Sequence, residues 1–401
     1  MSSKDAENDP REPSEGSAEA QAGAPAATGF APMAFVRSHP RLAIAASAML
    51  LAGIGAIATW ILLRPSPLQV ANKLADAALE ALDEDELEKA KKLAQDVSHH
   101  ADLVAPLAKA NYVLGTLGAR EAEKAPGPAK ASQYLAAARL LEEALDHGLP
   151  EDRVGDAKWL LGRSLYEAGQ LEACRKVLLE ALEDQPERQA QIRQLLTTAL
   201  RREWPPKLAE ALEQNKAYLA IAGLTAADRH EALVQQAEIL VEMGKPAESL
   251  KVLAELGPNA KYFPAVNVVE GRALLGEARA LKAKAKSEAD RQEATKKLQA
   301  ALATLRKARE AETVYTQNGR QALYLLGVCL TEMGDPQGAL DQFRELNAAE
   351  PTVPEYFAAA FQEAGLLRTM GRAADAVKAY CRALDAVRDA KEFRNPWMSA
   401  D

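Results

Sequence analysis

The stretch WLLGRSLYEAGQLEACRKVLLEALEDQP, residues Trp159–Pro186, contains small side chains at fixed intervals among leucines and charged residues. Gly162 and Gly169 come first, and Cys174 and Leu178 follow. Leucine, alanine, glutamate and lysine dominate the chain between Leu68 and Arg388, which includes this stretch, and these residues lose little rotamer freedom in a helix. The stretch therefore predicts two helices that are separated near Gly169.

The same intervals recur along the chain. In LYLLGVCLTEMGDPQGALDQFRELNAAEP, residues Leu323–Pro351, they are repeated by Gly327, Gly334, Ala339 and Phe343. Comparable frames begin near residues 71, 108, 155, 192, 230, 264, 320 and 357. Self-similarity at a nearly fixed period is typical of solenoids, in which each unit stacks on its neighbours. No convincing alternation of apolar and polar residues predicts a strand.

The repeated unit resembles the tetratricopeptide repeat, whose pattern places a Leu-Gly pair in one helix, a small residue and an aromatic in the next, and a proline afterwards. Gly162 and Cys174 occupy the small-residue positions in one unit, and Gly327 and Ala339 occupy them in another. The resemblance implies an all-α, tetratricopeptide-like solenoid of about eight helix pairs with a concave surface, over residues 71–390.

The glycines have physical reasons that do not depend on the resemblance. Gly162 and Gly327 fall in the middle of predicted helices, where glycine costs about 1 kcal/mol relative to alanine. That cost predicts a second helix close to the backbone at these positions. A further set is expected to end the first helix of its unit in a left-handed cap, namely Gly169, Gly244, Gly334 and Gly371.

Two units depart from the period, near residues 116–133 and 276–297. The first insertion is expected to lengthen the link between two helices. The second is rich in alanine and charged residues, and it predicts two helices that are extended by several turns and project from the solenoid.

The amino-terminal part has a different character. Residues 1–41 are rich in Ala, Pro, Gly, Ser and Glu, which predicts a disordered tail. LAIAASAMLLAGIGAIATWILL, residues Leu42–Leu63, contains no charge and predicts one transmembrane helix, followed by a short linker over 64–70. A cleaved signal peptide with a processing site near Ala56 is the alternative. Residues 391–401 are expected to form a carboxy-terminal tail.

The orientation of the predicted anchor is not fixed by charge, because basic residues on its two sides are nearly equal in number. A lone amino-terminal anchor more commonly keeps its tail in the cytoplasm, so we expect the solenoid outside the cytoplasm. Ala48, Ala52 and Ala56 form a ladder of small residues that would let two such helices approach closely, as in a homodimer.

Composition and cysteine spacing argue against two classes of function. The net charge of -8, without a basic stripe interleaved with aromatics, predicts that the chain does not bind nucleic acid. Cys174, Cys329 and Cys381 lie far apart within helical patterns, which fits neither a disulfide framework nor a zinc site. We expect all three to be buried, inert thiols.

No catalytic motif is present in the sequence. GxxxxGK[ST], GxGxxG after a strand, HExxH and GxSxG are all missing. The adjacent His99 and His100 cannot point to one metal ion from the same helix face. The chain is therefore predicted not to be an enzyme, with no catalytic residues, no cofactor and no metal site.

The inner face of the solenoid is the predicted binding site. In proteins of the resembled family, fixed positions of the first helices build this face, and here they include Tyr112, Trp159, Arg163, Tyr166, Arg193, Arg272, Tyr324 and Arg368. Trp159, Arg163 and Tyr166 are spaced to share one helix face. Trp, Tyr and Arg are enriched at binding hot spots. Alternatively, Trp159 and Tyr166 simply pack against the neighbouring unit.

Two functional hypotheses follow. The first is a membrane-anchored scaffold whose solenoid binds other proteins or peptides, similar to bacterial single-span tetratricopeptide proteins that accompany export or envelope-assembly machinery. The second is an accessory subunit of a membrane enzyme or transporter, associated through the anchor helix Leu42–Leu63.

Overall fold

The computed structural model describes residues 45, 48–56, 65–98, 103–348, 353–385 and 395–398. It divides into two units, Met1–Ser66 and Pro67–Asp401. In the first unit, residues 48–56 are helical and exposed. The predicted tail and much of the predicted membrane segment lie outside the described residues. Of the helices that are described, none combines the length and the apolar character needed to cross a membrane.

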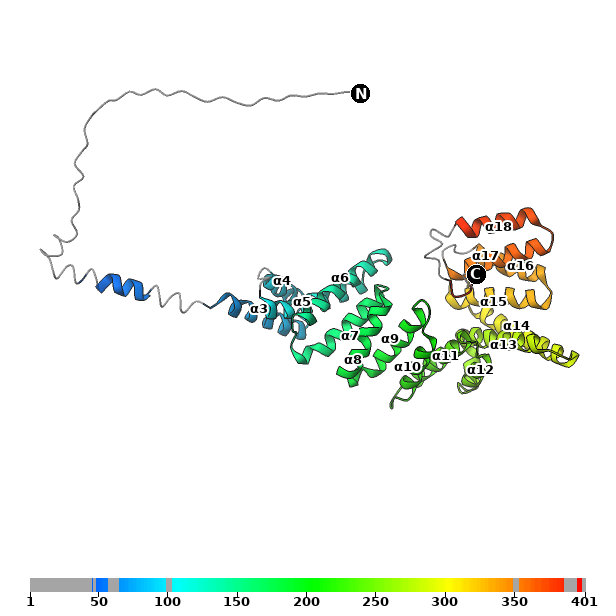
Figure 1. Ribbon diagram of the computed structural model, residues 1–401, viewed down its shortest axis with the longest axis horizontal. Coiled ribbons are helices and arrows are strands. Elements are labelled where there is room, and N and C mark those ends of the chain that lie inside the picture. Colours follow the sequence, from blue (N-terminus) through cyan, green and yellow to red (C-terminus); the bar gives the residue numbers. More distant parts are fainter. Residues whose placement is uncertain are drawn as a thin grey trace, which may run out of the picture. The chain divides into compact units, whose positions relative to one another are not determined.

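The second unit consists of eight consecutive helix pairs within the described residues (Figure 1). The pairs are α3 Pro67–Asp83 with α4 Leu87–Ser98, α5 Val104–Glu123 with α6 Gly127–Asp146, α7 Glu151–Glu167 with α8 Leu171–Asp184, α9 Gln189–Arg202 with α10 Leu208–Leu219, α11 Ala226–Glu242 with α12 Pro246–Ala254, α13 Pro264–Lys284 with α14 Glu288–Ala311, α15 Gln317–Met333 with α16 Pro336–Asn347, and α17 Pro354–Thr369 with α18 Ala373–Asp385. Each helix contacts the next one along the chain. The predicted all-α solenoid is confirmed.

The repeat register predicted from the sequence matches the helix pairs. Every unit origin falls near the beginning of a first helix. Seven residues after each origin stands a buried glycine or alanine, namely Ala78, Gly115, Gly162, Ala199, Ala237, Gly271, Gly327 and Ala364. Small side chains at this position let the second helix of each pair pack against the backbone of the first.

The helix glycines lie where the sequence predicts a close approach. A methyl group at Gly162 would overlap Leu178, and one at Gly327 would overlap Phe343. The predicted left-handed caps are also confirmed, because φ is 77° at Gly169, 72° at Gly244, 80° at Gly334 and 75° at Gly371. Glycine adopts this conformation without the strain that a Cβ atom would cause.

Both insertions are accommodated by long helices. The extra residues after Gly115 do not form the longer link expected from the sequence, because α5 continues to Glu123 and α6 begins already at Gly127. The reason is the helix-forming sequence on both sides of Pro126, which itself precedes the first residue of α6. The second insertion lies in α13 and α14, which are joined around Ser287.

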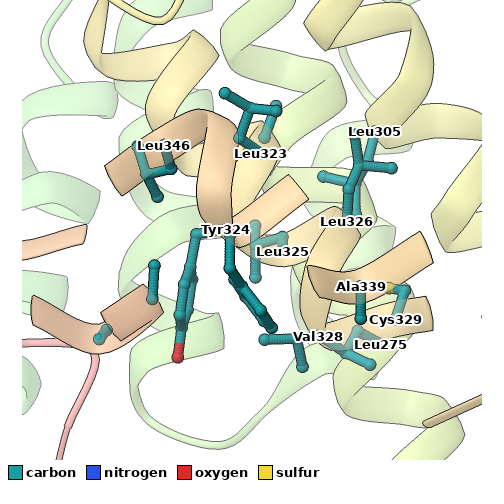
Figure 2. Close-up of a cluster of buried hydrophobic side chains, with 14 of the residues drawn as sticks. Leu275, Leu305, Leu323, Tyr324, Leu325, Leu326, Val328, Cys329, Ala339 and Leu346 are labelled. Atoms are coloured by element: carbon teal, nitrogen blue, oxygen red, sulfur yellow. The ribbon is translucent and has the colours of Figure 1, made fainter. Parts of the chain in front are cut away.

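A large apolar cluster joins the last three helix pairs. Figure 2 shows side chains of α14, α15 and α16 gathered in it, among them Leu305, Leu323 and Leu346. Cys329 is buried in this cluster, and Cys174 is buried between α8 and α9. The prediction that all three thiols are buried is wrong for Cys381, which is exposed. It lies two residues from the buried Ala379 and Ala383, and so on the opposite face of α18.

The first helices make two runs of direct contacts. α3, α5, α7 and α9 contact one another in order, and α11, α13, α15 and α17 do the same. The two runs are joined by α10, which packs on both α9 and α11, and by Arg201 of α9, whose guanidinium pairs with Glu238 and Glu242 of α11 at 2.8 and 2.9 Å. The predicted binding residues are therefore divided between the two runs.

Candidate functional site

A concavity of about 380 Å³ lies against the first helices α3, α5 and α7. Three residues predicted from the sequence line it, Tyr112 of α5 and Trp159 and Arg163 of α7. The rest of its lining consists of Leu82, Asp83, Thr116, Ala119, Arg120, Glu123, Arg153, Asp156, Leu160, Ser164 and Arg188. We call this concavity the amino-terminal groove. Arginines and carboxylates surround its aromatic side chains.

A two-pronged ion pair connects the first and third units in this groove. Arg153 Nη1 and Nη2 donate to Asp83 Oδ1 and Oδ2, at 2.8 and 2.5 Å. This hydrogen bonding lowers the pKa of Asp83 and raises the pKa of Arg153. Tyr112 lies beside them with 4% of its surface exposed, and burial raises its pKa. Arg153 therefore stays charged, and it fixes the position of α7 relative to α3.

The other arginines of the groove are paired near solvent. Arg163 Nη2 donates to Glu123 Oε1 at 3.0 Å, and Arg188 Nη2 donates to Asp156 Oδ1 at 2.6 Å. The side chain of Arg163 is 40% exposed and that of Glu123 is 58% exposed. Exposed pairs of this kind contribute about 0–1 kcal/mol, so a carboxylate from a ligand can replace Glu123 at little cost. Trp159 is half-buried next to Arg163.

Tyr166 and Arg193, predicted to belong to the same inner face, lie elsewhere. The Tyr166 ring packs against the cluster between α8 and α9, and the Arg202 guanidinium lies 4.8 Å from its centre. Arg193 Nη1 donates to Gln214 Oε1 of α10 at 2.7 Å. Trp159 also packs against the α8–α9 cluster, so this aromatic takes part both in stacking of the units and in the groove.

The three predicted residues of the second run have a different environment. Arg272 lies with its guanidinium 4.7 Å from the centre of the Trp397 ring. Tyr324 is buried and lies 5.2 Å from the same ring. Arg368 is exposed near the end of α17. The tail expected at residues 391–401 therefore includes a segment, Asn395–Met398, that covers part of this inner surface.

Several groove residues were missed by the sequence analysis. Asp83, Arg120 and Asp156 stand at the same register positions that were used to select the aromatics and arginines, so the register could have identified them. Arg153 precedes its unit origin and reaches the groove from the start of α7, so no register position points to it. Among the described residues, no cluster of three or more His, Cys, Asp or Glu side chains could hold a metal ion.

Comparison with known families supports the repeat assignment. Two tetratricopeptide-repeat family models match the chain, one at residues 130–215 and 204–317 and the other at 321–352. The chain contains tetratricopeptide repeats. These matches include both sequence stretches on which the resemblance was based. The search of curated proteins found no match.

Solved structures with a similar arrangement of helices include one that is described as a TPR protein. TTC0263, a thermophilic TPR protein of Thermus thermophilus, is 21% identical over 50% of this chain and 94% of its own, with a TM-score of 0.41. MamA is 18% identical over 46% of this chain and 90% of its own, with a TM-score of 0.33. The human IFIT1 dimer with m7Gppp-AAAA is 14% identical over 80% of this chain and 83% of its own, with a TM-score of 0.47.

Proposed function

We propose that this chain is a non-catalytic scaffold whose amino-terminal groove binds a segment of a partner protein. One observation carries the proposal: Tyr112, Trp159 and Arg163 line a single concavity, and the ion pair of Arg163 with Glu123 is exposed to solvent. Aromatic and arginine side chains in a concave site are the residues that most often dominate binding energy at interfaces.

The groove favours a partner segment that carries a carboxylate next to an apolar or aromatic side chain. Trp159 offers a partly exposed ring, and Arg163 lies one helical turn further along α7. A carboxylate of the partner would take the place of Glu123 beside Arg163, while a neighbouring apolar side chain covers Trp159. Because Arg163 presents a planar fork of donors, a two-pronged pair with the incoming carboxylate is favourable.

In this proposal the uncharged segment Leu42–Leu63 anchors the chain in a membrane, with its tail in the cytoplasm and the repeats outside, in envelope or export assembly. Its support is the length and apolar character of that segment. A reporter fused after Asp401 that is active only outside the cytoplasm tests the orientation. A cytoplasmic signal from this fusion would contradict the proposed orientation. Release of the chain from membranes by alkaline washing would contradict the proposed membrane anchor.

Affinity capture of the detergent-solubilised full chain tests the groove. The double variant Trp159→Ala and Arg163→Ala is compared with Trp204→Ala, a control that removes a tryptophan with 48% exposure outside the groove lining. We expect one or more partners to be lost from the double variant and kept by the control. Identical partner lists for all three proteins would remove the amino-terminal groove from consideration.

A further inference from the structure

The inner surface of the second helix run is covered by four residues from the end of the chain. Trp397 contacts Arg272 of α13 and Tyr324 of α15, with 4.7 Å between the guanidinium and the indole and 5.2 Å between the two rings. Asn395 Nδ2 donates to the carbonyl oxygen of Pro354 at the start of α17, at 2.8 Å. Three successive first helices therefore each supply one contact to the segment Asn395–Met398.

This segment has the features of a bound peptide. It forms a short turn and not a helix, because the backbone N–H of Trp397 donates to Asn395 Oδ1 at 2.8 Å. Asn395 is only 3% exposed, and the side chains of Trp397 and Met398 pack on the apolar cluster of α13–α18. The turn, the polar anchor and the aromatic ring together place one large side chain on the surface of the repeats.

The residues that receive the segment belong to the groove-lining register. Arg272 stands at the same place in its unit as Arg163, and Tyr324 stands at the same place as Tyr112 and Trp159. Gly327, which receives Phe343 of α16, stands at the helix-pair position, whereas the Tyr324 ring contacts both the core and the segment, with its centre 6.1 Å from that of Phe343 and 5.2 Å from that of Trp397. The segment thus covers the surface of the second run that is equivalent to the open amino-terminal groove. It contacts this surface through a cation–π contact and an edge-to-face ring contact.

We propose that the inner surface of α13, α15 and α17 is a second binding site, for a partner peptide that presents a tryptophan after an Asn-Pro turn, and that Asn395–Met398 is a competing ligand built into the chain. This inference rests on the proposed function, because it assigns a partner chemistry and a regulation to the same scaffold. Indole is the aromatic group that Arg272 binds best through its face. The preceding Asn-Pro pair shapes the turn and supplies the polar anchor.

Competition within one chain has a measurable consequence. A tethered ligand acts at an effective concentration on the order of millimolar, so a free peptide binds weakly until the tethered one is disabled. The test uses a fluorescein-labelled peptide with the sequence of residues 391–401 and the full-length chain, followed by fluorescence anisotropy. Two variants disable the tethered ligand, Trp397→Ala and Asn395→Ala. The second removes both side-chain hydrogen bonds of Asn395, the one to Pro354 and the one within the turn, and leaves the indole in place.

We expect either variant to bind the labelled peptide at least tenfold more tightly than the unmodified chain does. A labelled peptide with alanine at position 397 should not bind. In the Trp397→Ala chain, adding Tyr324→Ala should weaken binding about tenfold. Adding Tyr315→Ala, a control at a tyrosine with 76% exposure, should leave binding unchanged. Far-UV circular dichroism verifies that each variant retains its helices. If Trp397→Ala unfolds, the comparison of Asn395→Ala with the unmodified chain tests whether the segment competes with the peptide.

Two results would overturn the inference. If the variants do not bind the peptide, or bind it no more tightly than the unmodified chain, the segment is only part of the core. If Tyr324→Ala has no more effect than Tyr315→Ala, the peptide binds elsewhere. Neither result affects the capture experiment on Trp159 and Arg163, so failure of this inference is distinguishable from failure of the proposed function.

Discussion

The close approach of paired helices at Gly327 leads to a quantitative prediction. Replacing Gly327 with alanine would place the new methyl carbon 2.7 Å from Phe343 Cζ and 2.8 Å from Cδ1. Phe343 is fully buried, and the Tyr324 ring lies 6.1 Å away on α15, so the phenyl ring has no open space to enter. One of the two helices of this pair must shift.

The expected magnitude comes from two opposing effects. Alanine is favoured over glycine in a helix by about 1 kcal/mol. Forcing an extra carbon into a packed core costs about 1–3 kcal/mol. The net cost is therefore about 0–2 kcal/mol, and because the methyl group would overlap three atoms of Phe343, we expect Gly327→Ala to lower the free energy of unfolding by a value near the upper end of that range. Gly365 is the matched control, because it lies in α17 and a methyl group there would contact nothing within 4 Å. Gly365→Ala should raise stability by up to about 1 kcal/mol.

Urea unfolding followed by far-UV circular dichroism measures both variants. The midpoint should fall for Gly327→Ala and should stay or rise for Gly365→Ala. A third protein isolates the contact: in a Phe343→Ala background the whole phenyl ring is missing, so Gly327→Ala should cost less there. The reasoning is refuted if Gly327→Ala is at least as stable as the unmodified chain, or if its cost is the same in both backgrounds.

Three further predictions concern thiols, protonation and nucleic acid. A maleimide should label Cys381 alone in the native chain and all three cysteines after denaturation. Cys174 and Cys329 are protected because burial raises the pKa of each thiol to about 12. Rapid labelling of a second thiol in the native chain would contradict this prediction. Arg153 holds the pKa of Asp83 below its ordinary 3.8, so the ion pair stabilises the fold above that pH and is lost as the pH falls through the folded-state value. The difference in thermal midpoint between the unmodified chain and Asp83→Asn should therefore be present at pH 7 and vanish in acid, and an equal difference at both pH values would disprove it. A labelled RNA oligonucleotide should show no rise in anisotropy at physiological salt, and saturable binding would overturn the prediction made from net charge.

The sequence predicts the repeat architecture well because the close approach of the two helices in each pair requires a small residue at a fixed interval. A small residue must stand where the second helix meets the first, and Gly162 and Gly327 reveal the interval while alanines fill it in weaker units. Helix ends are predictable for the same reason, since Gly169 and Gly334 adopt left-handed caps. The outer face of the last helix has no such constraint, and the exposure of Cys381 was accordingly not foreseen.

The candidate site is less predictable, because the repeat register gives the direction in which a side chain points but does not identify the residues that the side chain contacts. Trp159 and Arg163 do line one concavity, as helical spacing suggests. Tyr166 has the same spacing, but its ring packs against the Arg202 guanidinium and the α8–α9 cluster and does not line the concavity. Asn395–Met398 carries no periodicity that would connect it with Tyr324, and only the folded chain brings them together.

The two helix runs show how one register can serve two purposes. In the amino-terminal groove Arg163 is held by Glu123 of the neighbouring unit, and this pair is exposed and weak, whereas the two-pronged pair of Arg153 with Asp83 is less exposed. In the second run the corresponding Arg272 is also paired with a carboxylate of the neighbouring unit, Glu242 of α11 at 3.7 Å, and in addition it lies under the Trp397 indole of its own chain. A partner that binds the first surface exchanges ion pairs, whereas one that binds the second must displace a tethered ligand. The first site should therefore respond to salt, and the second should respond to changes in Trp397.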